Sequence, residues 1–77
     1  MTTRNLLIAG NYRQAAQFAY DQGWQLREWA YVMDTDHLRG YRRDGAIVWY
    51  VGTWYERSFL HELQRMVATR GFETRIP

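Results

Sequence analysis

Two short apolar segments, each closed by a glycine, dominate the hydrophobic pattern of the chain. Residues 5–9 read NLLIA ahead of Gly10, and residues 46–51 read AIVWYV ahead of Gly52. A short, continuous apolar run that ends at a turn residue is typical of a strand buried on both faces of a parallel sheet. The pattern therefore predicts two buried strands, and the more hydrophobic one, 46–51, is expected to be central.

A helical pattern follows the first of these strands. Asn11 can cap a helix over Tyr12–Gln22, with Gln14 at the capping-box spacing, and Gly23 suits the stop of that helix. Alanines on one face of this helix would let it lie close to a sheet.

The second apolar strand is followed by similar signals. Thr53 and Glu56 have the capping-box spacing, so the pattern predicts a helix that starts there, continues to about Arg70 and stops at Gly71.

Weaker elements lie between and after these units. Residues 24–33 alternate well enough for a strand, and residues 34–40 predict one capped turn of helix ended by a glycine. Residues 41–45 form a polar loop with an Asp-Gly turn signal, and residues 72–76 predict a final strand.

The alternation of strands and helices predicts the fold class. Segment 8–14 lines up with 50–56, since both read strand, glycine, small polar cap, aromatic residue, any residue, Gln or Glu. Such alternation implies parallel pairing, and right-handed crossovers limit the topology. We expect one α/β domain over residues 1–77, with an open, mostly parallel four-stranded sheet in the order 2-1-3-4 and two main helices on opposite faces. This is half of a Rossmann-like or flavodoxin-like fold; a ferredoxin-like or other α+β arrangement is the alternative.

Composition narrows the cellular setting. The 77 residues include no Cys, which removes disulfides and thiolate metal sites and fits a reducing compartment. The apolar runs are far shorter than the roughly 18 residues that a membrane span needs. The apolar stretch near the N-terminus is also too short for a signal peptide, so we expect a cytoplasmic protein with no membrane partner.

Charge argues against a nucleic-acid partner. All ten basic residues are Arg, a bias that high-GC coding produces, but the net charge is only +2. Arg39, Arg42 and Arg43 with Tyr41 form the densest basic patch and could contact a phosphate backbone. The simpler explanation of this basic patch is a solvated loop whose positive charge is balanced by Asp44.

The expected topology places one candidate ligand site. The connections leave strands 1 and 3 in opposite directions, so a crevice opens between the turns that follow them. Backbone N–H groups at helix N-termini and two arginines are the ingredients of a phosphate or carboxylate site, and aromatic rings could stack on a base. The candidate ligand-binding residues are Gly10, Asn11, Tyr12, Arg13, Gly52, Thr53, Trp54 and Arg57, with Tyr55 as a further stacking residue.

Tight turns and helix caps explain the same residues without a ligand. The first turn lacks a dinucleotide-binding or P-loop motif and the chain has no Lys, so we assign no cofactor. Ser58 and His61 could touch but lack an oxyanion hole, and Asp34, Asp36 and His37 match no metal-ligand spacing. We assign no catalytic residue and no metal site.

The topology also predicts an uncovered part of one sheet face. A single helix of about three turns would cover the face that the first helix occupies, although strand 46–51 is apolar on both sides. We therefore expect a homo-oligomer joined through this face, with Trp29, Tyr31, Trp49 and Tyr50 as candidate interface residues. Ring side chains that close the gap within one chain are the competing outcome.

Three stretches carry a resemblance to a known group of proteins. IAGNYRQA at 8–15, LRG at 38–40 and VGTWYER at 51–57 resemble the small uncharacterised Rossmann-like accessory proteins of actinobacterial phages, and the likeness covers most of the chain. The resemblance implies an accessory phage protein that acts in the host cytoplasm, by binding a host protein, and implies no reaction.

The sequence thus favours a non-enzymatic, self-associating interaction module that acts on a host or phage protein. A nucleotide- or phosphate-binding domain that uses the two glycine turns is the alternative. Nucleic-acid binding through the Arg39–Arg43 loop is a third hypothesis.

Overall fold

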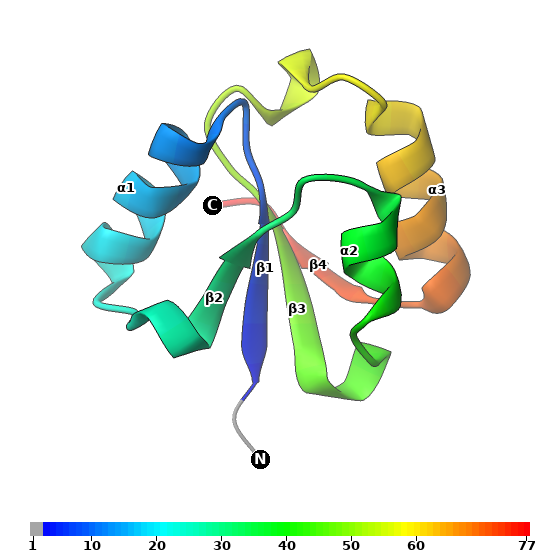
Figure 1. Cartoon of the computed structure of the whole chain (residues 1–77), viewed down its shortest axis with the longest axis horizontal. Helices are drawn as coiled ribbons and strands as arrows, with labels where there is room; N and C mark the ends of the chain where they lie inside the picture. Colours follow the sequence, from blue (N-terminus) through cyan, green and yellow to red (C-terminus); the bar gives the residue numbers. More distant parts are fainter. Residues whose placement is uncertain (1–2) are drawn as a thin grey trace.

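The computed structural model describes residues 3–77 as an open, all-parallel, four-stranded sheet with helices on both faces (Figure 1). The strands lie in the order β2-β1-β3-β4, and their bounds are β1 (Arg4–Ile8), β2 (Trp29–Tyr31), β3 (Ala46–Tyr50) and β4 (Glu73–Arg75). The other elements are α1 (Tyr12–Gln22), α2 (Thr35–Arg39) and α3 (Leu60–Arg70), with 3₁₀ turns η1 (Leu26–Glu28), η2 (Arg43–Gly45) and η3 (Trp54–Glu56). The predicted α/β class and the strand order 2-1-3-4 are confirmed.

The sheet separates two hydrophobic cores. Helix α1 covers one face, and α2 and α3 pack side by side on the other (Figure 1). This division follows from right-handed crossovers, because the chain moves one way from β1 to β2 and the other way to β3 and β4. Side chains of alternate strand residues point into the two cores. Leu6 and Val48 lie beneath α2 and α3, whereas Leu7 and Trp29 lie beneath α1.

The predicted first helix over Tyr12–Gln22 is confirmed to the residue. The Asn11 side chain accepts a hydrogen bond from the backbone N–H of Gln14 at 3.0 Å, and Gly23 ends the helix with φ +75°. The predicted end of the second long helix is also confirmed, because Gly71 stops α3 with φ +73°.

The strand predicted over residues 24–33 is confirmed only at its centre, Trp29–Tyr31. The residues before it form η1, in which the Glu28 carboxylate accepts a hydrogen bond from the backbone N–H of Gln25 at 2.7 Å. This capped turn satisfies backbone groups locally and leaves Leu26 78% exposed. The alternating apolar pattern over residues 24–33 therefore corresponds to a turn followed by a short edge strand, rather than to one long strand.

The predicted start of the second long helix at Thr53 is wrong, because α3 begins at Leu60. Residues Trp54–Glu56 form only the turn η3, and the Thr53 side chain caps nothing, since its hydroxyl is bonded to Gln14 of α1. Phe59 then adopts φ +58°, a left-handed conformation that stands between η3 and α3.

The remaining predicted elements are short. The capped helical turn within residues 34–40 is confirmed as α2, whose N-cap Asp34 accepts a hydrogen bond from the backbone N–H of His37 at 3.0 Å. The polar loop ends in η2, and the final strand β4 is exposed throughout. Within residues 3–77, no helix combines the length and the apolar character needed to cross a membrane.

Aromatic side chains cover the part of the α1 face that α1 does not reach. The rings of Phe18, Trp24 and Trp49 lie with their centroids 5.5 to 5.7 Å apart. The guanidinium of Arg75, on the edge strand β4, lies 5.8 Å from the Trp49 ring, and the Trp49 Nε1–H donates to Asn5 at 2.9 Å. These side chains largely close, within one chain, the gap expected on this face.

The central strand offers a direct test of the fold. Val48 is fully buried, and its neighbour across the β3–β4 ladder, Thr74, is exposed. Val48→Asp should prevent folding, because an unpaired carboxylate in the core costs several kcal/mol, as much as the whole stability of a small domain. Thr74→Asp should keep the native far-UV circular dichroism spectrum. A cooperative thermal unfolding transition for Val48→Asp would show that this strand is misplaced.

Candidate functional site

The turns after β1 and β3 lie side by side at one edge of the sheet. We call this edge, formed by residues 9–13, 32–35 and 51–59, the C-terminal edge. β1 and β3 are paired along their full lengths, and just beyond them the Val51 N–H donates to the Ile8 carbonyl at 3.0 Å. The chain then leaves these strands towards opposite faces (Figure 1). Open α/β sheets bind ligands at such a position.

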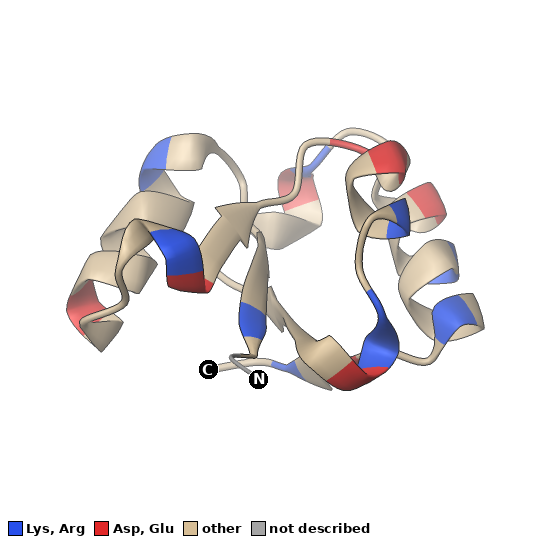
Figure 2. Cartoon of the chain, turned by 60° about the horizontal axis from the view of Figure 1, so that its bottom comes forward, with Lys and Arg blue, Asp and Glu red and all other residues tan. Residues whose placement is uncertain are grey.

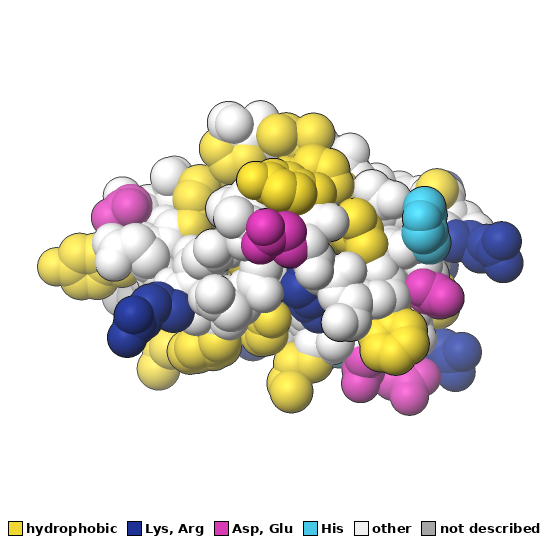
Figure 3. Space-filling model, turned by 90° about the horizontal axis from the view of Figure 1, so that it is seen from above, with side chains coloured by type: hydrophobic (Ala, Val, Ile, Leu, Met, Phe, Trp, Pro, Cys, Tyr) yellow, Lys and Arg dark blue, Asp and Glu magenta, His cyan; other side chains and the backbone are white. Residues whose placement is uncertain are grey.

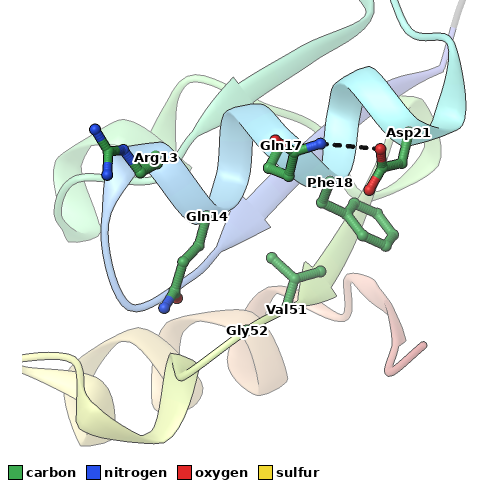
Figure 4. Close-up of a pocket in the computed structure, with 7 residues that line it drawn as sticks. All are labelled: Arg13, Gln14, Gln17, Phe18, Asp21, Val51 and Gly52. Atoms are coloured by element: carbon green, nitrogen blue, oxygen red, sulfur yellow. Dashed lines mark hydrogen bonds between the residues drawn. The ribbon is translucent and has the colours of Figure 1, made fainter.

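The side-chain amide of Gln14 fills the space between these two turns. Its Oε1 accepts hydrogen bonds from the backbone N–H groups of Gly10, at 2.9 Å, and Thr53, at 3.0 Å. Its Nε2 donates to the Thr53 hydroxyl at 3.0 Å. Figure 4 shows the Gln14 side chain reaching from α1 towards the segment that contains Gly52. The donors that could have bound a phosphate are therefore engaged by an amide of the same chain.

The two glycines are explained by this close packing. A Cβ on Gly10 would lie 2.0 Å from Thr53 Oγ1, and a Cβ on Gly52 would lie 2.4 Å from Gln14 Oε1. Gly52 also has φ +57°, which side chains disfavour. Both positions need glycine so that the turns can close around Gln14, with or without a ligand.

The two candidate arginines do not meet at a common site between the turns. Arg57 donates to the carbonyls of Ala9, at 3.2 Å, and Met33, at 3.0 Å, and its guanidinium lies 5.0 Å from the Tyr31 ring centroid. It thereby joins the ends of β1 and β2 to the segment before α3. Arg13 is exposed and points away from Gln14 (Figure 4).

A shallow groove of about 430 Å³ remains beside the closed turns, between α1 and the end of β3 (Figure 4). Phe18 and Val51 supply its apolar lining, and Arg13 and Asp21 stand at opposite ends. Gln17 donates to Asp21 at 3.0 Å, so part of the polar rim is satisfied within the chain. Because one cation and one anion flank it, this groove has no net charge to attract a phosphate.

The candidate stacking residues pack on other rings near the strand ends. On the α1 face, the ring centroid of Tyr12 lies 5.9 Å from that of Trp29 and 5.7 Å from that of Tyr31. On the other face, Trp54 lies 5.1 Å from Tyr50. These contacts anchor the rings, and Tyr12 is still 57% exposed.

The four candidate interface residues differ in how deeply the structure buries them. Trp29 and Tyr50 are 7% and 8% exposed and belong to the cores on opposite faces, so neither offers a surface to a second chain. Burial raises the pKa of the Tyr50 phenol above its ordinary value. Tyr31 and Trp49 are half-buried on the α1 face.

Apart from Tyr50, no residue with an ionisable side chain is buried within residues 3–77. Burial is the usual means by which a fold perturbs a catalytic group. In the same part of the chain, no three His, Asp or Glu side chains are grouped to hold a metal ion. Comparison with known protein families, curated protein sequences and solved structures finds no match to this chain.

Gln14 should contribute more to stability than any neighbouring exposed glutamine. Gln14→Ala leaves two partly buried backbone N–H groups without a protein acceptor, so we expect a loss of about 2 kcal/mol in the free energy of unfolding. For a domain of this size the melting temperature should fall by about 10 °C.

Gln17→Ala is the matched control, because Gln17 lies on the same helix and only bonds the exposed Asp21. Its effect should stay within about 0.5 kcal/mol. Equal stabilities of the two variants in urea denaturation would contradict the role assigned to Gln14.

Proposed function

We propose that this protein is a non-enzymatic interaction module that associates with a second copy of itself through the C-terminal edge of its sheet. The observation that carries the proposal is a set of large, exposed apolar side chains on that edge. They are Tyr12 (57% exposed), Met33 (71%), Tyr55 (62%) and Phe59 (75%). Figure 3 looks down on this edge, and hydrophobic side chains are spread across it.

This surface favours a protein partner over a small molecule. Aromatic residues and Met are enriched in protein interfaces, where they bury large areas at little cost in conformational entropy. A nucleotide or phosphate at the two glycine turns would instead have to displace Gln14 from the N–H groups of Gly10 and Thr53. The hydrogen bonds that Gln14 already makes therefore disfavour nucleotide or phosphate binding at the two glycine turns.

Charges at the two ends of the C-terminal edge suit a symmetric dimer. Arg13 lies at the α1 end, and Asp34 and Glu62 line a common pocket with Phe59 at the α2–α3 end. None of these three charges forms an ion pair within residues 3–77. A two-fold axis that lies in the contact plane and crosses the middle of the edge, perpendicular to its long direction, would exchange the two ends. It would therefore bring Arg13 of each copy to the acidic end of the other.

The dimensions of the edge suit a small, reversible interface. The Cα atoms extend 31 Å by 20 Å in the view of Figure 3, so one copy offers roughly 600 Å² of contact area. A stable complex typically buries about 800 Å² on each partner. We therefore expect a dimer that dissociates on dilution.

The backbone of Phe59 also supports a contact at this edge. Phe59 is the one non-glycine residue with a positive φ among residues 3–77, and its side chain is 75% exposed. The left-handed conformation costs about 1–2 kcal/mol for a residue with a Cβ. An exposed ring recovers little of this energy in the monomer, whereas burial against a partner would recover it.

The resemblance to phage accessory proteins extends the proposal to other partners. A host or phage protein could use the same edge in place of the second copy. The absence of Cys from the 77 residues suits the reducing cytoplasm in which such a protein would act.

Phe59→Gly should increase the stability of the monomer and weaken its self-association. Glycine removes the left-handed strain, so the free energy of unfolding of the dilute protein should rise by about 1 kcal/mol. The same change removes the aromatic contact, so the dimer dissociation constant should increase about tenfold or more in sedimentation equilibrium.

Tyr20→Ala is the control, because Tyr20 is 80% exposed near the far end of α1. It should leave self-association unchanged. A wild-type protein that stays monomeric up to about 300 μM, which corresponds to less than about 5 kcal/mol of binding, would refute self-association.

A further inference from the structure

A shallow, open depression near the end of the sheet opposite the C-terminal edge gathers arginines from two elements, and we call it the arginine cleft. This arginine cleft has a volume of about 390 Å³, lies between η2 and the last turn of α3, and is lined by Arg42, Arg43, Asp44 and Arg70. Figure 2, in which the bottom of Figure 1 comes forward, shows basic residues both in the segment before β3 and at the end of α3.

The fold holds one of these side chains by a hydrogen bond and places another beside it. Arg70 donates from Nη2 to the carbonyl of Tyr41 at 3.2 Å, which connects the end of α3 to the segment before η2. The Arg43 side chain lies over the turn at Gly71, with its Cδ and Nη1 3.5 Å from where a Cβ would stand there. A side chain that is already held, as Arg70 is, loses less conformational entropy when it binds an anion.

The positive charge of the cleft is not neutralised by ion pairs. Within residues 3–77 the ion pairs are Arg39 with Asp36 and Arg75 with Glu73, and both lie outside the cleft. Asp44 lines the cleft but pairs with none of its arginines. The carbonyl end of α3 adds a partial negative charge nearby, which offsets only part of three guanidinium charges.

We propose that the arginine cleft binds a small phosphate with two or more negative charges, such as a phosphate monoester or pyrophosphate. Guanidinium groups match phosphate oxygens in paired hydrogen bonds, and such an anion can share several of them at once. A small ligand is favoured over a nucleic acid because the net charge of the chain is only +2. The site is separate from the C-terminal edge, so it stands independently of the proposed self-association.

The test is a titration of the whole protein with pyrophosphate at constant ionic strength, followed by ¹H–¹⁵N NMR. We expect saturable shifts of the Arg43 and Gly71 amides. Arg42→Gln and Arg70→Gln should each weaken binding about fivefold or more, and Asp44→Asn should tighten it about two- to fivefold by removing a competing charge. Arg65→Gln is the control, since Arg65 lies on α3 outside the cleft.

Three results would overturn the proposal. The first is the absence of saturable shifts at about 20 mM pyrophosphate, a concentration that reveals even millimolar affinity. The second is equal affinity in the wild type and in the cleft variants that keep a well-dispersed spectrum. The third is salt-sensitive binding of single-stranded RNA through the same arginines without any response to pyrophosphate, which would assign the cleft to a polynucleotide instead.

Discussion

The hydrogen bonds from the Gly10 and Thr53 backbones to the amide of Gln14 join the two turns at the point where the crossovers diverge. Parallel strands that send their connections to opposite faces leave unpaired N–H groups at this point, and those groups need an acceptor. In many α/β proteins a ligand supplies it. Here helix α1 supplies it, and the glycines at positions 10 and 52 leave room for the amide. The crevice is therefore a structural joint between α1 and the segment after β3.

A second constraint follows from the small size of the chain. Only α1, an 11-residue helix, covers one face of four strands, and it leaves part of β3 and β4 bare. The rings of Phe18, Trp24 and Trp49, with Arg75 above the last of them, occupy the area that another helix would cover in a larger domain. The aromatic content of 17% thus has a structural use. Each ring buries more area than an aliphatic side chain, which partly compensates for a missing element.

The sequence predicted α1 from local signals, and it misplaced the start of α3 because a distant contact decides it. The start and stop of α1 depend on Asn11 and Gly23, which act on their own neighbours. The start of α3 was misplaced because the Thr53 hydroxyl is bonded to Gln14, 39 residues away, and so does not cap a helix. The two glycine turns were correctly expected at one edge. The partner of their N–H groups could not be predicted, because a capping-box Gln normally bonds its own N-cap residue.

The parallel topology places several exposed apolar residues and several arginines at opposite edges of the sheet. All four strands run the same way, so residues that follow strands gather at one edge and residues that precede them gather at the other. The exposed apolar residues Tyr12, Met33, Tyr55 and Phe59 follow strands, and four arginines stand at or shortly before strand starts: Arg4, Arg27, Arg43 and Arg70. Gln14 closes the crevice between the strand ends, whereas both edges carry exposed side chains. An apolar edge suits a protein partner and a basic edge suits an anion, so one arrangement of strands can present two chemically distinct surfaces.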